Sequence, residues 1–159
     1  MRLHIETPAF APKQRIPDQF TRQGGNVSPR IEWSGAPADT RSFALVVEDP
    51  DAPSPEPFCH WLVWGLAPQK GQLLEGETPP RVGKNSFGNS EWLLPDPPTG
   101  HGAHDYVFQL FALDQALTLM SGASRSDVLG AMKGHVIAAA VLTATYLRSD
   151  EEDWEDDGG

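Results

Sequence analysis

The sequence predicts a single, mainly β domain, and three observations support this fold class. The 159 residues include fifteen glycines and fifteen prolines, which fall between short apolar runs. This placement of the glycines and prolines indicates strands joined by structured loops. The longest apolar run, residues 136–142, is far too short to span a bilayer. Four runs have the length of strands: residues 30–33, 42–48, 58–65 and 106–113.

Taken in order, the run 30–33 is the first expected strand. Residues 42–48 form a continuous apolar run between polar residues, which is typical of a strand buried on both faces. The run 58–65 is also apolar but contains His60. Residues 106–113 have the same character as 42–48, so we expect this strand to be buried on both faces too.

One segment is expected to be helical. Ser126 precedes Asp127, which places an acid in the first turn, while Lys133 lies in the last turn and Gly134 ends the helix. Residues 136–146 contain several alanines and could extend this helix. Their valine, isoleucine and threonine residues favour a strand, and a strand is what we expect there.

The net charge of −10 is mostly local, because seven of the 22 acidic residues follow Ser149. The rest of the chain carries 15 acids against 12 lysines and arginines, without a basic stripe. Nucleic acid and anionic membranes are therefore poor partners. We expect a domain over residues 1–148 and an acidic, disordered tail over 149–159. The lone Cys59 and the lack of a signal-like N-terminal segment predict a cytoplasmic protein.

Two rigid, titratable stretches suggest a binding site. Asp49 and Asp51 stand in a proline-rich turn directly after a buried strand, so a stiff loop should present two carboxylates at the end of the sheet. These acids could instead simply cap a turn. His60 follows this loop and could be oriented by it. Cys59, its neighbour, should face the opposite side of the strand and fill the core.

The second stretch leads into the last of the four strands. Pro97 and Pro98 exclude a helix or a central strand, and the glycines after them allow the backbone to approach a ligand closely. His104 and Tyr106 are two residues apart at the start of a strand and therefore share a face. Imidazole and phenol donors beside carboxylates suit a phosphate or carboxylate group.

These motifs occur together in an order that resembles the phosphatidylethanolamine-binding protein (PEBP) family, in particular its prokaryotic Raf-kinase-inhibitor-like branch. The resemblance covers roughly residues 3 to 147. It rests on Asn26-x-Ser28-Pro29-x-Ile31-x-Trp33, Ser42-Phe43-Ala44 before Asp49-Pro50-Asp51-Ala52-Pro53, His60-Trp61, Phe87-Gly88, Pro97-Pro98-x-Gly100-x-Gly102-x-His104-x-Tyr106 and Gly134-His135-Val136.

The resemblance implies a PEBP-like fold, in which a central antiparallel sheet lies beside a second smaller sheet with one or two short helices. It also implies an anion-binding pocket at the end of the strands, a kinase or protease as protein partner in some members, frequent homodimers, and no common catalytic activity. By position, the pocket would be lined by Asp49, Asp51, His60, His104 and Tyr106, with Pro97 and Pro98 at its rim. Trp92 falls where the family often has tyrosine and could form a wall for the apolar part of a ligand.

Three positions depart from the family pattern. Asp105 replaces the usual arginine between the histidine and the tyrosine, Asp96 replaces a small residue before the two prolines, and Leu94 replaces another usual glycine. Added carboxylates disfavour an anion by about 1 kcal/mol per charge when water screens them. A zwitterion, with its ammonium near Asp96 and its phosphate near the histidines, would fit better.

The sequence therefore predicts a non-catalytic binding protein for a small phosphorylated, anionic or zwitterionic ligand, without cofactor or metal. A hydrolase acting on phosphoesters or esters is the alternative, with Asp49 or Asp51 and His60 activating water. No G-x-S-x-G motif supports it. A metal site or a pure protein-interaction role remain as further alternatives. The metal site would be formed by Asp49, Asp51, His60, His101 and His104, but these residues lack the spacing of a zinc motif.

Overall fold

The computed structural model describes residues 2–21, 27–50, 58–92 and 104–146, and the expectations for the tail lie outside them. Within these residues the chain is mainly β, as predicted, with two antiparallel sheets, one α-helix and a short 3-10 helix. The strands are β1 (His4–Glu6), β2 (Ile31–Ser34), β3 (Ser42–Asp49), β4 (Phe58–Leu66), β5 (Gln72–Leu73), β6 (Arg81–Val82), β7 (His104–Leu113) and β8 (Val136–Tyr146). The helices are η1 (Asp18–Phe20) and α1 (Arg125–Met132).

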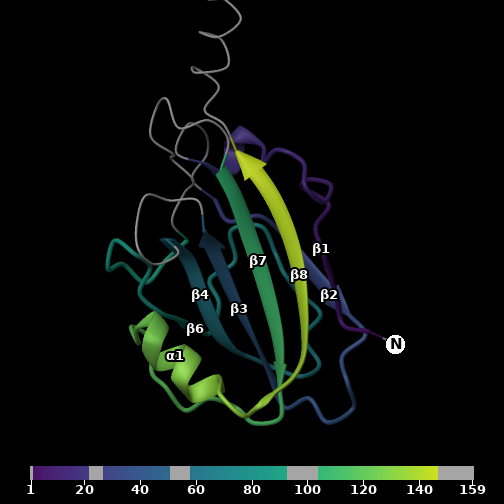
Figure 1. The fold of residues 1–159 in the computed structure, drawn as a ribbon, viewed down its shortest axis with the longest axis vertical. Helices are drawn as coiled ribbons and strands as arrows, with labels where there is room; N and C mark the ends of the chain where they lie inside the picture. Colours follow the sequence, from purple (N-terminus) through teal and green to yellow (C-terminus); the bar gives the residue numbers. More distant parts are fainter. Residues whose placement is uncertain (1, 22–26, 51–57, 93–103, 147–159) are drawn as a thin grey trace, which may run out of the picture.

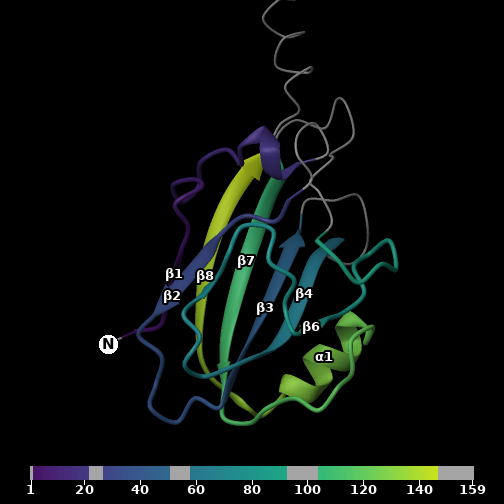
Figure 2. The ribbon, with the colours of Figure 1, turned by 180° about the vertical axis from the view of Figure 1, so that it is seen from behind.

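The large sheet has the order β6-β4-β3-β7-β8, and the small sheet has the order β1-β2-β5. The small sheet covers one face of the large sheet, while α1 lies on the other face, over β3 and β4 (Figures 1 and 2). β3 and β7 run side by side with β4 and β8 outside them, so the last residues of β3 and β8 lie beside the first residues of β4 and β7. No helix in the described part of the chain combines the length and apolarity needed to cross a membrane.

Two apolar clusters hold these layers together. The larger cluster lies between the sheets and includes Leu45, Val47 and Phe108, and the smaller one packs Val46 and Trp64 under α1. β3 is buried at every position, which confirms the prediction for residues 42–48. The same prediction for residues 106–113 is wrong, because β7 alternates between buried and more exposed residues. The reason is that α1 covers β3 and β4 and leaves the outer face of β7 and β8 largely open.

The four predicted strands are all present, with ends shifted by one or two residues. The largest consequence is at β7, which starts at His104 rather than Tyr106 and thereby places His104 opposite Tyr146 in β8. Residues 136–146 form a strand, as we expected. The prediction did not include β1, β5 and β6, which are only two or three residues long.

The helix begins at Arg125, two residues before the start that a cap at Ser126 would give. Its N-cap is Ser124, not Ser126, and Ser124 and Asp127 form a reciprocal capping box. Ser124 has the extended backbone (φ −80°, ψ 165°) that an N-cap requires, whereas Ser126 already lies inside the helix. Lys133 stands just past the last turn, and Gly134 follows with φ 83°, as expected of a glycine that ends a helix.

Candidate functional site

Four of the predicted site residues lie at one end of the large sheet. Asp49 is the last residue of β3, His60 lies near the start of β4, and His104 and Tyr106 are the first and third residues of β7. Because these strands are antiparallel neighbours, the end of β3 adjoins the starts of β4 and β7. Each residue is at most 4% exposed. Buried polar side chains of this kind need partners, and the structure supplies them.

The centre of the site is a hydrogen bond between His104 and Asp49. Nδ1 of His104 lies 2.6 Å from Oδ2 of Asp49, and both side chains are buried. The carboxylate can only accept, so Nδ1–H of His104 donates to it. This bond fixes the orientation and tautomer of the His104 imidazole. The expected orientation of His60 by the acidic turn stays a prediction.

A β-bulge directs His60 toward the face of the sheet that carries Tyr106. Val47 pairs with Trp61 and Glu48 pairs with Cys59, so His60 is an extra residue in β4. Regular alternation would place His60 opposite both of its neighbours. Instead, Trp61 belongs to the core between the sheets and Cys59 to the core under α1, while the ring of His60 meets that of Tyr106 edge-on at 5.1 Å.

Cys59 is therefore a core residue, as predicted. Burial, followed by the neighbouring carboxylate of Glu48, raises the pKa of its thiol to about 11. A thiol of this kind remains protonated near neutral pH and is a poor nucleophile.

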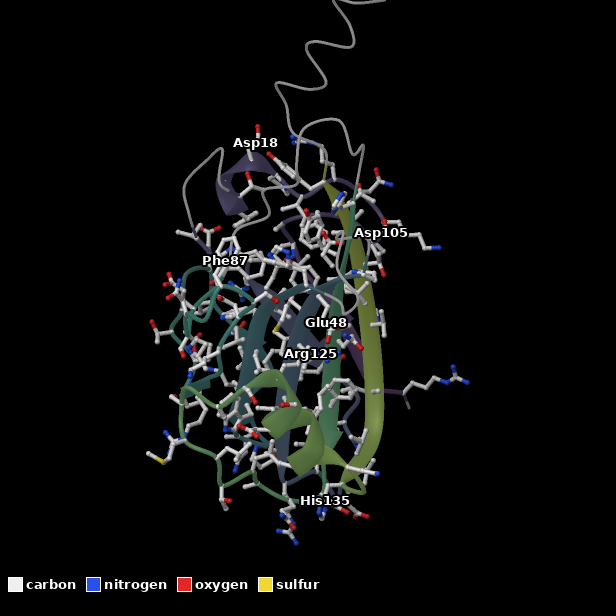
Figure 3. All side chains as sticks on the ribbon, turned by 60° about the vertical axis from the view of Figure 1, so that its left-hand side comes forward. Asp18, Glu48, Phe87, Asp105, Arg125 and His135 are labelled. Carbon is white, nitrogen blue, oxygen red and sulfur yellow. The ribbon has the colours of Figure 1, made fainter. Side chains whose placement is uncertain are left out.

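An aromatic row that the sequence analysis did not assign to the site continues from His60 to the surface. The rings of Phe58 and His60 lie 5.2 Å apart, and Phe58 meets Phe87 edge-on at 5.4 Å. Phe87 is 62% exposed, so the row leads outward (Figure 3). The available signal was the Phe87-Gly88 pair, a motif without an obvious structural role.

Tyr146 is a second residue that the sequence analysis missed. It pairs with His104 across β7 and β8, its hydroxyl donates to Asp18 (3.0 Å), and that hydroxyl accepts from Oγ1 of Thr21 (3.1 Å). The guanidinium of Arg15 lies 4.6 Å from the ring centroid. Burial, assisted by the Asp18 carboxylate, raises the pKa of this phenol. Since Asp18 and Arg15 come from the N-terminal segment, only the folded chain reveals this group.

Trp92 packs on the same face, deeper along the sheet. Its ring meets Trp61 edge-on at 5.4 Å and stacks on Phe108 at 6.2 Å, and its indole N–H donates to the carbonyl of Phe20 (3.2 Å). The indole also borders a cavity of about 280 Å³ together with Ser28, Glu77 and Glu91. Its assignment as a ligand wall stays a prediction.

Asp51, Pro97, Pro98, Asp96 and His101 lie outside the described residues. Asp105 is described, and it is exposed and alternates with His104 and Tyr106 along β7. Its carboxylate therefore starts from the opposite face of the strand, which weakens the charge argument drawn from this position (Figure 3). Among residues 2–21, 27–50, 58–92 and 104–146, no three histidine, cysteine, aspartate or glutamate side chains are grouped to hold a metal ion.

Comparison with known proteins agrees with this fold. A UPF0098 protein of the archaeon Methanothermobacter thermautotrophicus is 38% identical over 156 residues, which cover 92% of this chain and 99% of that protein. A crystal structure of the PEBP homolog CT736 from Chlamydia trachomatis superposes with a TM-score of 0.88 at 34% identity, covering 92% of this chain and 98% of that one.

A third relative bears on cellular location. A Mycobacterium tuberculosis protein named as the lipoprotein LppC is 39% identical over 146 residues, or 91% of this chain and 72% of that protein. The cytoplasmic location expected from the sequence therefore stays a prediction. Finally, the family profile described as phosphatidylethanolamine-binding protein matches residues 6–147. The chain thus belongs to the phosphatidylethanolamine-binding protein family.

Proposed function

We propose that this protein is a non-catalytic binding protein, which holds a small phosphorylated, anionic or zwitterionic ligand at the shared end of β3, β4 and β7. The observation that carries the proposal is the buried Asp49–His104 pair, with His60 and Tyr106 on the same face. Asp49 orients an imidazole at the strand ends, and the neighbouring phenol offers a second hydrogen-bond donor. Asp51, Pro97, Pro98 and Trp92 are proposed as further ligand contacts.

The two described acids that adjoin the pair in sequence, Glu48 and Asp105, are not directed at it. Nε of Arg125 binds Oε1 of Glu48 (2.9 Å) under α1 (Figure 3). Asp105 likewise extends from the other face of β7. An ammonium group on the ligand would be accommodated by the acidic loops, as the zwitterion hypothesis requires.

An NMR titration tests the proposal. Phosphate, acetate and phosphoethanolamine would be added separately to the full chain while the imidazole signals are followed. We expect saturable shifts at His60 and His104. His4 in β1 and His135 at the far end of the large sheet serve as internal controls that should not move (Figure 3). Unperturbed His60 and His104 signals with all three ligands would contradict the proposal.

The alternative function, a hydrolase for phosphoesters or esters, is favoured by one observation. A carboxylate-oriented imidazole is an arrangement used for general-base catalysis, and here Asp49 orients His104. The base in this reading is therefore His104 rather than His60. Assays of phosphoester and ester panels with the wild type and His104→Ala distinguish the two functions, because only a hydrolase would show turnover that the substitution abolishes.

Ligand occupancy is proposed to modulate a protein partner such as a kinase or a protease, and the protein is proposed to be cytoplasmic and to form a homodimer. Capture of kinases or proteases by the wild type and by His104→Ala tests the first point: equal capture would separate partner binding from the pocket. Sedimentation of the purified chain measures its oligomeric state directly.

A further inference from the structure

The cavity beside Trp92 is separate from the four residues Asp49, His60, His104 and Tyr106, none of which lines it. It measures about 280 Å³. Its walls come from four parts of the chain: Ser28 before β2, Trp61 in β4, Glu77 and Thr78 after β5, and Glu91 with Trp92 after β6. This volume is near the lower end of the range for small-molecule sites, roughly 300 Å³ and above, and suits a ligand of only a few heavy atoms.

Two indoles form the aromatic part of the wall. Trp61 is 2% exposed, and the half-buried Trp92 stands nearly perpendicular to it, at an interplanar angle of 80°. Trp92 is held in place by its stacking on Phe108 and by its N–H bond to the carbonyl of Phe20. The faces of indole rings carry negative electrostatic potential, and tryptophan is the most favourable aromatic partner for a cation.

The charges around the cavity have the same sign as the ring faces. The acidic residues Glu77 and Glu91 both line the cavity, while no lysine or arginine is among the described lining residues. Partial burial would raise the pKa of Glu77, but hydrogen bonds from the Leu74 amide and the Lys70 ammonium outweigh it and lower the pKa. Glu77 is thus ionised and already neutralised by Lys70, which leaves Glu91 as the net negative charge.

Ser28 adds a polar group inside the wall. It is 5% exposed, and its carbonyl accepts from the Gly76 amide. Ser28 also lines the cavity, where its hydroxyl can pair with a ligand oxygen.

We propose that this cavity binds a small organic cation: an alkylated ammonium group directed at Trp92 and Glu91, carrying a hydroxyl or carbonyl that pairs with Ser28. A weakly hydrated ammonium gains from the indole faces and from the carboxylate, while its methyl groups fill the apolar part of the wall. This site can be tested apart from the Asp49–His104 pair, because none of Asp49, His60, His104 and Tyr106 lines the cavity, although Trp92 is proposed as a contact for both ligands.

The test compares choline with 3,3-dimethylbutan-1-ol, a neutral molecule of nearly the same shape. The readout is the indole N–H signal of Trp92 in NMR spectra of the full chain, assigned through Trp92→Phe. We expect choline to shift this signal saturably and to bind at least about tenfold more tightly than the neutral alcohol, a difference of about 1.4 kcal/mol. Equal affinity for the two molecules, or no saturable shift with choline, overturns the proposal.

Two substitutions locate the interaction. Glu91→Gln should weaken choline binding several-fold, whereas Glu75→Gln, an exposed acid that does not line this cavity, should leave it unchanged. Ser28→Ala should remove any preference for choline over tetramethylammonium, which lacks the hydroxyl. Equal losses with Glu91→Gln and Glu75→Gln would indicate only general attraction to an acidic protein and would also overturn the proposal. Histidine shifts with phosphate report on the other site separately.

Discussion

Nδ1 of His104 and Oδ2 of Asp49 form a 2.6 Å hydrogen bond between two side chains that are almost completely buried. The protein contains a second pair of the same type, in which Nδ1 of His135 lies 2.9 Å from Oδ1 of Asp114. The second pair is substantially exposed, with 35% and 43% of the two side chains accessible. The two pairs therefore offer a matched comparison of the same contact in different surroundings.

We expect Asp49→Ala to lower the free energy of unfolding by about 3 kcal/mol, because it leaves a buried imidazole without its carboxylate. Asp114→Ala should cost less than about 1 kcal/mol, since water can replace an exposed partner. Urea denaturation of both variants measures the difference. Similar losses would show that burial does not determine the strength of the Asp49–His104 pair.

The buried thiol of Cys59 should lower the free energy of unfolding at alkaline pH. Its thiol has an ordinary pKa of 9.0, which burial raises to about 11 in the folded chain. Between these values the unfolded chain has lost this proton while the folded chain retains it, so stability falls as the pH rises. The loss should reach about 2 kcal/mol by pH 11.

The control for this prediction is Cys59→Ala, which removes the titrating group. Other groups also titrate in this range, so the relevant quantity is the difference between the two proteins. The unfolding free energies of wild type and Cys59→Ala should approach each other between pH 9 and pH 11. If the two curves stay parallel, the thiol does not titrate as proposed.

Much of the site could be predicted because its residues occur in local patterns. The spacing of His104 and Tyr106 placed them on one face, and the buried run 42–48 placed Asp49 at the end of a strand. His60 shows the limit of this reasoning. Its face depends on a bulge opposite Val47, a property of strand pairing rather than of the local sequence.

The remaining differences also arise from tertiary structure. Whether β7 is covered on both faces depends on where α1 packs, and the partners of Tyr146 come from more than a hundred residues away. The helix cap is a different case, because its signal lies in the local sequence. Ser124 stands three residues before Asp127, the spacing of a capping box, whereas Ser126 only adjoins it.

Substitution of Ser124 and of Ser126 by alanine tests which serine caps the helix. Oγ of Ser124 accepts from the Asp127 amide at 3.1 Å, and the Asp127 side chain accepts in turn from the Ser124 amide. Ser124→Ala should therefore cost about 1 kcal/mol of stability. Ser126→Ala lies within the first turn and should cost less than about 0.5 kcal/mol. Thermal unfolding of the two variants would contradict the observed cap if Ser126→Ala proved the more harmful.

Replacement of glycine by alanine should have opposite effects on stability at Gly130 and at Gly83. Gly130 lies within α1, and a Cβ added there would meet no atom within 4 Å. Gly130→Ala should therefore stabilise the protein by about 0.5–1 kcal/mol, because alanine loses less conformational freedom in a helix.

Gly83 is closely packed instead. A Cβ there would lie 2.4 Å from Leu62 and 2.7 Å from the carbonyl of Ala123. The backbone cannot easily move away, since the Gly83 amide donates to the Leu62 carbonyl and the next amide donates to Ala123. Gly83→Ala should cost about 1–3 kcal/mol, as overpacking does elsewhere. Chemical denaturation of both variants measures the two changes in unfolding free energy, and a Gly83→Ala protein as stable as the wild type would show that Gly83 packs against Leu62 and Ala123 less closely than described.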